Sequence, residues 1–291
     1  MSTDWIELTR RAAFASHRLI GWIYWDPVAI EHYAALGVPD GMGYYIATRG
    51  ASLAPAGPGA VTAAFGSIHP GFVKASLDMC TAVTTFEAAA EARNAGVVAG
   101  IHEYAPEIAD GLAALAEPMW ATADSLDPAG RVLFASLRDQ PRPDDALLSA
   151  WLAVNCVREW RGDTHWAMHI AADVDGTMAG ILDGAWRNYD DDWLPRSRGA
   201  DDAAMEAAMK RLQDRGFAAG GEVTDAGIAW RVNHENELDR LCSGGWQHLG
   251  EANTLAFLDL VEPVGDRFME RIDETAGPKW MPAGRDWQTR K

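Results

Sequence analysis

The chain has 291 residues, of which 48% are hydrophobic and 23% charged, and its formal net charge is −17. This length suits one large domain or two ordinary ones. So acidic a surface repels a phosphate backbone unless a local basic patch overrides it, which makes nucleic acid an unfavourable partner. No apolar run is long enough to span a bilayer, so no membrane association is expected.

The sequence carries neither a targeting signal nor a disulfide pattern. The first residues, Met-Ser-Thr-Asp-Trp-Ile-Glu, lack the basic and then apolar order of a signal peptide. Cys80, Cys156 and Cys242 are isolated along the chain, which fits a reducing compartment. There is no Cys-x-x-Cys pair, so a structural zinc site is not expected. These features together predict a cytoplasmic protein.

The first 160 residues are predicted to be nearly all helix. Apolar residues recur at three- and four-residue spacing over 4–20. Asp26-Pro27 has the pattern of an N-cap followed by a first helical residue, and Thr84-Thr85-Phe86-Glu87 resembles a capping box. Proline and glycine divide the stretch into further helices. These are expected at about 27–36, 58–67, from 70, after the box at 84–87, 106–123, from 128, and 144–160.

The second half of the chain has a different pattern of helices and turns. Gly162-Asp163 is expected to break its first helix. Asp175 caps a helix to about residue 186, and the loop with Asp190, Asp191 and Asp192 is expected to be solvated. A Gly-Gly turn between short apolar pieces predicts a small hairpin near residue 220, before a helix that Thr224 caps. Further helices are expected at about 165–172, 201–215 and 253–272, and the residues from 277 are expected to be loose.

This layout resembles a winged helix-turn-helix of the MarR type. Leu212, Arg215-Gly216 and Val223-Thr224-x-x-Gly227 match the end of the recognition helix, the turn before the wing and the start of the dimer helix in such regulators. The resemblance implies a mainly α fold and a homodimer formed by the terminal helices. We expect a helical domain over 1–143, a winged-helix-like domain over 144–275 and a loose tail over 276–291.

About residues 15–265 are also similar to an actinobacterial family known only as a helix-turn-helix family. Three features carry this similarity: Gly43-Tyr44-Tyr45 with Arg49-Gly50-Ala51, the connection from Pro55 to Gly59, and Arg158-Glu159-x-Arg161-Gly162-Asp163-x-His165. The family implies DNA binding by analogy of fold, and fold alone does not define function.

The residues themselves argue against DNA binding. The expected recognition helix opens with Asp201 and Asp202, where a DNA reader approaches bases and phosphates. No Lys or Arg lies between Arg215 and Arg231, so the wing is not basic. Arg196 and Arg198 are the nearby cations, whereas useful affinity takes about six or more phosphate contacts. DNA is therefore expected to be an improbable partner.

The stretch from Trp151 to His169 is the candidate site, because charged, imidazole and indole side chains crowd together there. Burying such groups is costly unless they are paired. The stretch is either a structural ion-pair node or the floor of a site. The 13 tryptophans leave a similar choice between an indole-rich core and an aromatic-lined pocket.

If the stretch is catalytic, His165 is the acid–base group and Asp163 orients it. Arg158 and Arg161 then bind anionic groups, and the remaining wall of the pocket is aromatic and polar. We expect that wall to come from Tyr45, Arg49, His69, Trp151 and Trp166.

A metal site on His165 and His169, four residues apart on one helix, is a weaker alternative. His69, His102, Asp163 and Asp173 could supply a third ligand only if the fold brings one of them near. His234 and His248 are expected at the surface. No cofactor is expected.

Two hypotheses about function follow. The first is a cytoplasmic small-molecule-binding protein on a repurposed winged-helix fold. As an enzyme it would perform cofactor-free acid–base chemistry, of lyase, isomerase or hydrolase type, on a hydrophobic or planar metabolite. The alternative is a ligand-responsive MarR-like transcriptional regulator, in which the same pocket binds an effector. The sequence does not identify the ligand.

Overall fold

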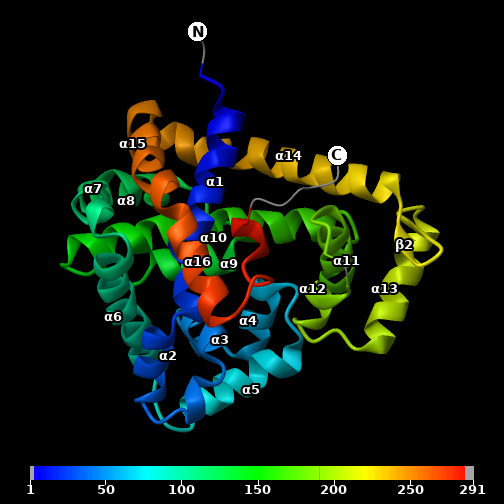
Figure 1. The fold of residues 1–291 in the computed structure, drawn as a ribbon, viewed down its shortest axis with the longest axis horizontal. Coiled ribbons are helices and arrows are strands. Elements are labelled where there is room, and N and C mark those ends of the chain that lie inside the picture. The colour runs from blue at the N-terminus through cyan, green and yellow to red at the C-terminus, as the bar shows by residue number, and fades with distance from the viewer. Residues whose placement is uncertain (1–2, 190, 286–291) are drawn as a thin grey trace.

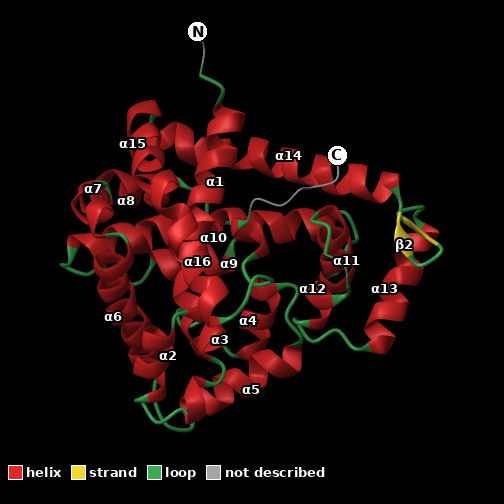
Figure 2. Ribbon diagram, in the orientation of Figure 1, coloured by secondary structure: helices red, strands yellow, loops and turns green. Residues whose placement is uncertain are grey.

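The computed structural model describes residues 3–189 and 191–285, and this part of the chain is mainly helical (Figures 1 and 2). Its sheet has two short antiparallel strands, β1 (Ala218–Ala219) and β2 (Glu222–Val223). The expected fold class, mainly α with a small hairpin, is confirmed at this level.

The N-terminal half is a body of packed helices joined by short turns. Asp26 and Thr85 accept hydrogen bonds from backbone N–H groups in the first turns of α2 and α6. The cap of α2 is the predicted one, and the cap of α6 lies one residue after the first threonine of the expected capping box. In chain order the helices are α1 (Trp5–Gly21), α2 (Pro27–Ala34), α3 (Tyr44–Arg49), α4 (Pro58–Phe65), α5 (Pro70–Thr81), α6 (Phe86–Tyr104), α7 (Ala109–Ala114), α8 (Ala116–Ser125) and α9 (Val132–Arg138).

Helix α10 (Ala146–Ala171) is the central element and runs through the molecule in Figure 1. The predicted break at Gly162-Asp163 is wrong, because the helix passes through both residues. A glycine inside a helix costs only about 1 kcal/mol. Packing of α10 against α1, α7, α8 and α9 outweighs that cost, as tertiary burial usually outweighs propensity.

The segment after α10 forms a smaller unit at one edge of the molecule (Figure 1). Helix α13 leads into the hairpin, whose Gly220 and Gly221 have the positive φ angles of a tight turn. Thr224 caps the next helix, as predicted. This arrangement is consistent with a winged helix-turn-helix. The helices are α11 (Gly176–Trp186), α12 (Trp193–Arg196), α13 (Asp202–Asp214) and α14 (Asp225–Leu249).

The C-terminal region departs from prediction in two ways. The single helix expected over 253–272 is two helices, α15 (Glu251–Val261) and α16 (Gly265–Thr275), separated by a 3-10 turn that contains Pro263. The tail is packed as far as Arg285: Met281 is 7% exposed and belongs to the main core. The rest of the predicted loose tail, 286–291, lies outside the described residues.

Two hydrophobic cores organise the chain. The main core joins α1 to α10 with the second half of α14, α15 and α16. The smaller core joins α11, α13 and β1, and Trp166 of α10 and Trp230 of α14 pack against it. The main core therefore extends across residue 144, where the boundary between the two domains was predicted. The division into two domains stays a prediction. Helices α10 and α14 belong to both cores, so the seam between the cores lies along these two helices.

Candidate functional site

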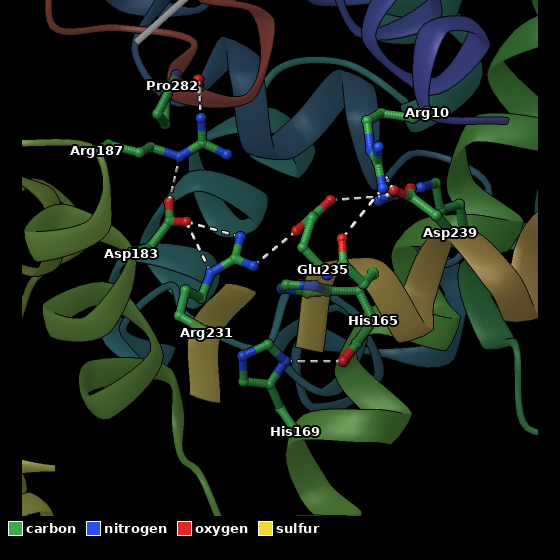
Figure 3. Close-up of polar contacts among 11 residues, drawn as sticks. Arg10, His165, His169, Asp183, Arg187, Arg231, Glu235, Asp239 and Pro282 are labelled. Carbon is green, nitrogen blue, oxygen red and sulfur yellow. Dashed lines mark hydrogen bonds and ion pairs between the residues drawn. The ribbon is translucent and has the colours of Figure 1, made fainter. Parts of the chain in front are cut away.

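A chain of buried ion pairs runs along this seam (Figure 3). Arg231 on α14 contacts Asp183 on α11 (2.8 Å) and Glu235 (2.7 Å). Arg161 on α10 contacts Glu235 (2.6 Å) and Asp239 (2.7 Å). Burial raises the pKa of Glu235, but Arg231 and Arg161 outweigh it and hold that pKa well below its ordinary value. The network therefore keeps Glu235 ionised and clamps three helices together.

A second buried node is centred on Glu159 of α10. Arg49 donates to both carboxylate oxygens at 2.8 Å, and Arg158 donates to one of them at 2.6 Å. Burial raises the pKa of Glu159, yet the two guanidinium groups lower it overall, to about 2. Arg158 also donates from Nε to Nδ1 of His17 (3.0 Å), which fixes that nitrogen as an acceptor. This node connects α1, α3 and α10.

Two adjoining cavities lie between these nodes and share part of their walls. The arginine-side cavity has a volume of about 190 Å³, and the aromatic-side cavity about 380 Å³. The residues common to both walls are His17, Ser67, Arg158, His165, Trp166, Arg198, Pro282 and Ala283.

The two cavities differ in chemistry. Arginines on α10 and α14, together with Arg187 and Arg198, line the smaller one, and so do Asp183 and Glu235. Aromatic side chains dominate the larger one. They are Trp25, Tyr45, Phe65, Phe72, Trp166, Trp193 and Trp280.

The C-terminal segment 277–285 forms one wall of both cavities. Trp280 contacts Trp25 (ring centroids 5.5 Å apart) and Trp193 (4.9 Å). The carbonyl oxygen of Pro282 accepts a hydrogen bond from Arg187 (2.9 Å; Figure 3). The segment predicted to be loose therefore covers the site.

Arg198 stands apart from the other arginines. Its guanidinium donates from Nη1 to the carbonyl oxygen of Leu194 (2.8 Å), and no carboxylate within the described ranges pairs with it. Burial is the main cause that lowers the pKa of Arg198. The charge of Asp183 acts in the opposite direction without forming an ion pair with it. A partly buried cation that has no ion-pair partner in the described ranges, on a cavity wall, favours an anion beside it.

Three histidines gather where α10 and α14 meet. Ring centroids of His169 lie 4.2 Å from those of His165 and 4.1 Å from those of His234. Burial is the main cause that lowers the pKa of all three, to about 3 for His234, so the rings are neutral near pH 7. This cluster could hold a metal ion.

The structure brings together many of the predicted site residues. Arg158 lines both cavities, and Arg161 lines the arginine-side cavity. Tyr45 and Arg49 line the aromatic side. His165 and Trp166 lie on the shared wall.

Three predicted residues lie elsewhere. Asp163 accepts a hydrogen bond from the backbone N–H of Phe134 (2.9 Å). It points away from His165, because residues two apart on a helix face different sides. Trp151 is fully buried and donates to the carbonyl oxygen of Leu19, and His69 is exposed and caps α5. The expected Asp163–His165 pair is therefore wrong.

The other metal-ligand candidates also lie apart from the histidine cluster. His102 is exposed on α6, and Asp173 pairs with Arg211. His248 is exposed as expected, but the surface position predicted for His234 is wrong, since that residue is 7% exposed.

Sequence reasoning missed most of the site residues outside α10. One signal was present: Arg231, Glu235 and Asp239 recur every four residues and so share a face of α14. Nothing local distinguished His17, Arg198 or Trp280, which join the site only through contacts distant in sequence.

Comparison with known protein families assigns the chain to one of them. The chain belongs to a helix-turn-helix family, whose sequence pattern matches residues 9–275. No curated protein and no solved structure matches the chain. Within the described ranges, no helix is both long and apolar enough to cross a membrane.

Proposed function

We propose that the two cavities bind one organic anion that has an aromatic or apolar body. The aromatic-side cavity takes the body, and the arginine-side cavity takes a carboxylate, sulfonate or phosphate head. The observation that carries this proposal is Arg198, a cation with no carboxylate partner within the described ranges, at the junction of the two cavities.

A second donor without a hydrogen-bond partner supports the same place for the anionic head group of the ligand. The Nε of Arg161 is buried and has no hydrogen-bond partner in the described part of the chain. Leaving a buried donor without an acceptor costs about 1–3 kcal/mol of stability, and more if the donor is charged. An anion that accepts from Arg198 and Arg161 removes part of that cost. Binding then draws on charge-assisted hydrogen bonds and on aromatic contacts at once.

Calorimetry with a matched pair of probes tests the proposal. We expect 2-naphthoate to bind, and its neutral counterpart 2-naphthalenemethanol to bind at least tenfold more weakly. Arg198→Met should remove this preference, because the desolvated charge is lost while the stem of the side chain remains. The control is Arg240→Met, since Arg240 pairs with Glu237 on the exposed face of α14.

Native mass spectrometry of the purified protein supplies an unbiased test of ligand class. A co-purified organic acid supports the proposal, and a co-purified organic cation or neutral lipid contradicts it. If the folded Arg198→Met variant and the unaltered protein bind 2-naphthoate with equal affinity, the anion-binding proposal is contradicted.

Family membership favours a second candidate, a ligand-responsive DNA-binding regulator, over the enzyme hypothesis. The hairpin follows α13 and precedes α14, the chain order in which a wing follows a recognition helix. On this hypothesis the bound anion shifts the orientation of α13, and a homodimer reads two half-sites. The comparisons give no support to catalysis, and the expected acid–base pair does not form.

Electrostatics weigh against strong DNA binding by α13. Its cations are already paired within the chain: Lys210 with Asp214, and Arg211 with Asp173 and Asp175. A salt-dependent gel-shift assay with the DNA upstream of the gene tests the regulator hypothesis. A specific shift that 2-naphthoate or the native ligand releases supports it, and no specific shift at low salt rejects it.

A further inference from the structure

We propose that His165, His169 and His234 bind one divalent transition-metal ion of the zinc class. The three side chains offer nitrogen atoms that all lie within 4.8 Å of one another. His165 and His169 are four residues apart on α10, and His234 faces them from α14. Imidazole nitrogens are ligands that suit zinc, nickel, copper and iron.

The hydrogen bonds leave one ring nitrogen of His169 available as a ligand. Its Nδ1 lies 2.9 Å from the carbonyl oxygen of His165, where it donates (Figure 3). A histidine that ligates a metal commonly gives its other N–H to a backbone carbonyl in this way. The Nε2 atom of His169 is then the nitrogen that remains available to bind a metal.

His234 supplies the observation that most strongly indicates a missing ligand. The residue is 7% exposed, and its Nε2 is buried without a hydrogen-bond partner in the described part of the chain. Such an orphaned polar atom is uncommon in a packed interior and costs free energy. Coordination of a metal by this nitrogen would satisfy it.

The surroundings suit a partly shielded metal site with an open position. Trp166 and Trp230 pack against the histidine rings. The nearest guanidinium, Arg231, already has Asp183 and Glu235 as counter-charges, which reduces its repulsion of a cation. His165 and His169 also line the arginine-side cavity, so a fourth coordination position would face it.

The cluster is close to the size of a tetrahedral metal site. Ligand nitrogens around tetrahedral zinc are separated by roughly 3.4 Å, given Zn–N bonds of about 2.0–2.1 Å. The nitrogens of the cluster lie within 4.8 Å of one another, so at most a small contraction is needed. Half-buried His165 has room to rotate its ring.

The test titrates chelator-treated full-length protein with Zn²⁺ by calorimetry and with Co²⁺ by visible absorption. We expect one ion per chain and intense tetrahedral Co²⁺ bands. His234→Gln and His165→Gln should each weaken Zn²⁺ binding at least tenfold and abolish the bands. His248→Gln is the matched control, because His248 is an exposed histidine on the same helix as His234.

Circular dichroism and melting of the metal-free variants establish that each is folded. If His234→Gln does not fold, half-buried His165 supplies the decisive variant. Unchanged Zn²⁺ affinity in a folded His165→Gln variant overturns the proposal, and so does the lack of stoichiometric binding by the unaltered protein. Because metal alone is the probe, failure here leaves anion binding by Arg198 untouched.

Discussion

Glu159→Gln is the sharpest test of the node that builds the aromatic-side wall. The substitution keeps the shape of the side chain and removes its charge. In the native protein Glu159 neutralises both Arg49 and Arg158, and all three side chains are at most 12% exposed. The variant leaves two buried guanidinium groups uncompensated.

The expected loss of stability is about 3–5 kcal/mol at pH 7, the usual cost of removing one partner from a buried ion pair. The pKa shift gives a similar size: a fall from the ordinary 4.5 to about 2 corresponds to roughly 3 kcal/mol. For a chain of this size the melting temperature should drop by roughly 6–15 °C.

The pH dependence follows from the direction of the shift. Because the pKa of Glu159 is depressed in the folded state, its ionised form stabilises the protein fully above about pH 4.5. That stabilisation is lost as the pH falls toward about 2. The difference in melting temperature between the native protein and Glu159→Gln should therefore shrink below about pH 4.5.

Thermal unfolding followed by circular dichroism from pH 7 to pH 3 measures both effects. Glu237→Gln is the control, because Glu237 forms an exposed ion pair with Arg240 and should leave the melting temperature unchanged. A Glu159→Gln variant that melts like the native protein at pH 7 would refute the reasoning, as would a gap that stays constant with pH.

Three further predictions concern the cavity walls and α10. Gly66 has a φ of 62°, and a Cβ there would lie 2.2 Å from the ring of Trp166. Gly66→Ala should therefore lower the melting temperature and weaken 2-naphthoate binding measured by calorimetry. Trp280→Ala removes ring contacts with Trp25 and should weaken the same probe about tenfold, roughly 1.4 kcal/mol. Burial raises the pKa of Asp163 to about 6, above the ordinary 3.8, so its ionisation destabilises the fold as the pH rises through that range. Asp163→Asn should be at least as stable as the native protein at pH 7.5 and lose its advantage near pH 4 in melting experiments; lower stability at pH 7.5 would contradict this.

Much of the local structure could be predicted from the sequence, because its causes are local. Asp26, Asp175 and Thr224 cap the helices they were expected to cap, since a short oxygen-bearing side chain satisfies a free N–H of the first turn. The cap of α6 is Thr85, one residue after the first threonine of the expected capping box. The Gly-Gly pair forms the expected hairpin turn because positive φ angles suit glycine. The concentration of charge on residues 158–161 indicated correctly where α10 meets the cavities.

Tertiary structure decided the rest, because burial outweighs local preference and joins residues far apart in the chain. Packing on several sides carries α10 through Gly162-Asp163, and this continuity separates Asp163 from His165. Only the fold brings His234 against α10, leaves Arg198 without a carboxylate partner within the described ranges and lays Trp280 over the site. The sequence by itself determined which chemical groups are present; the packing of α10 and α14 determined which of them meet.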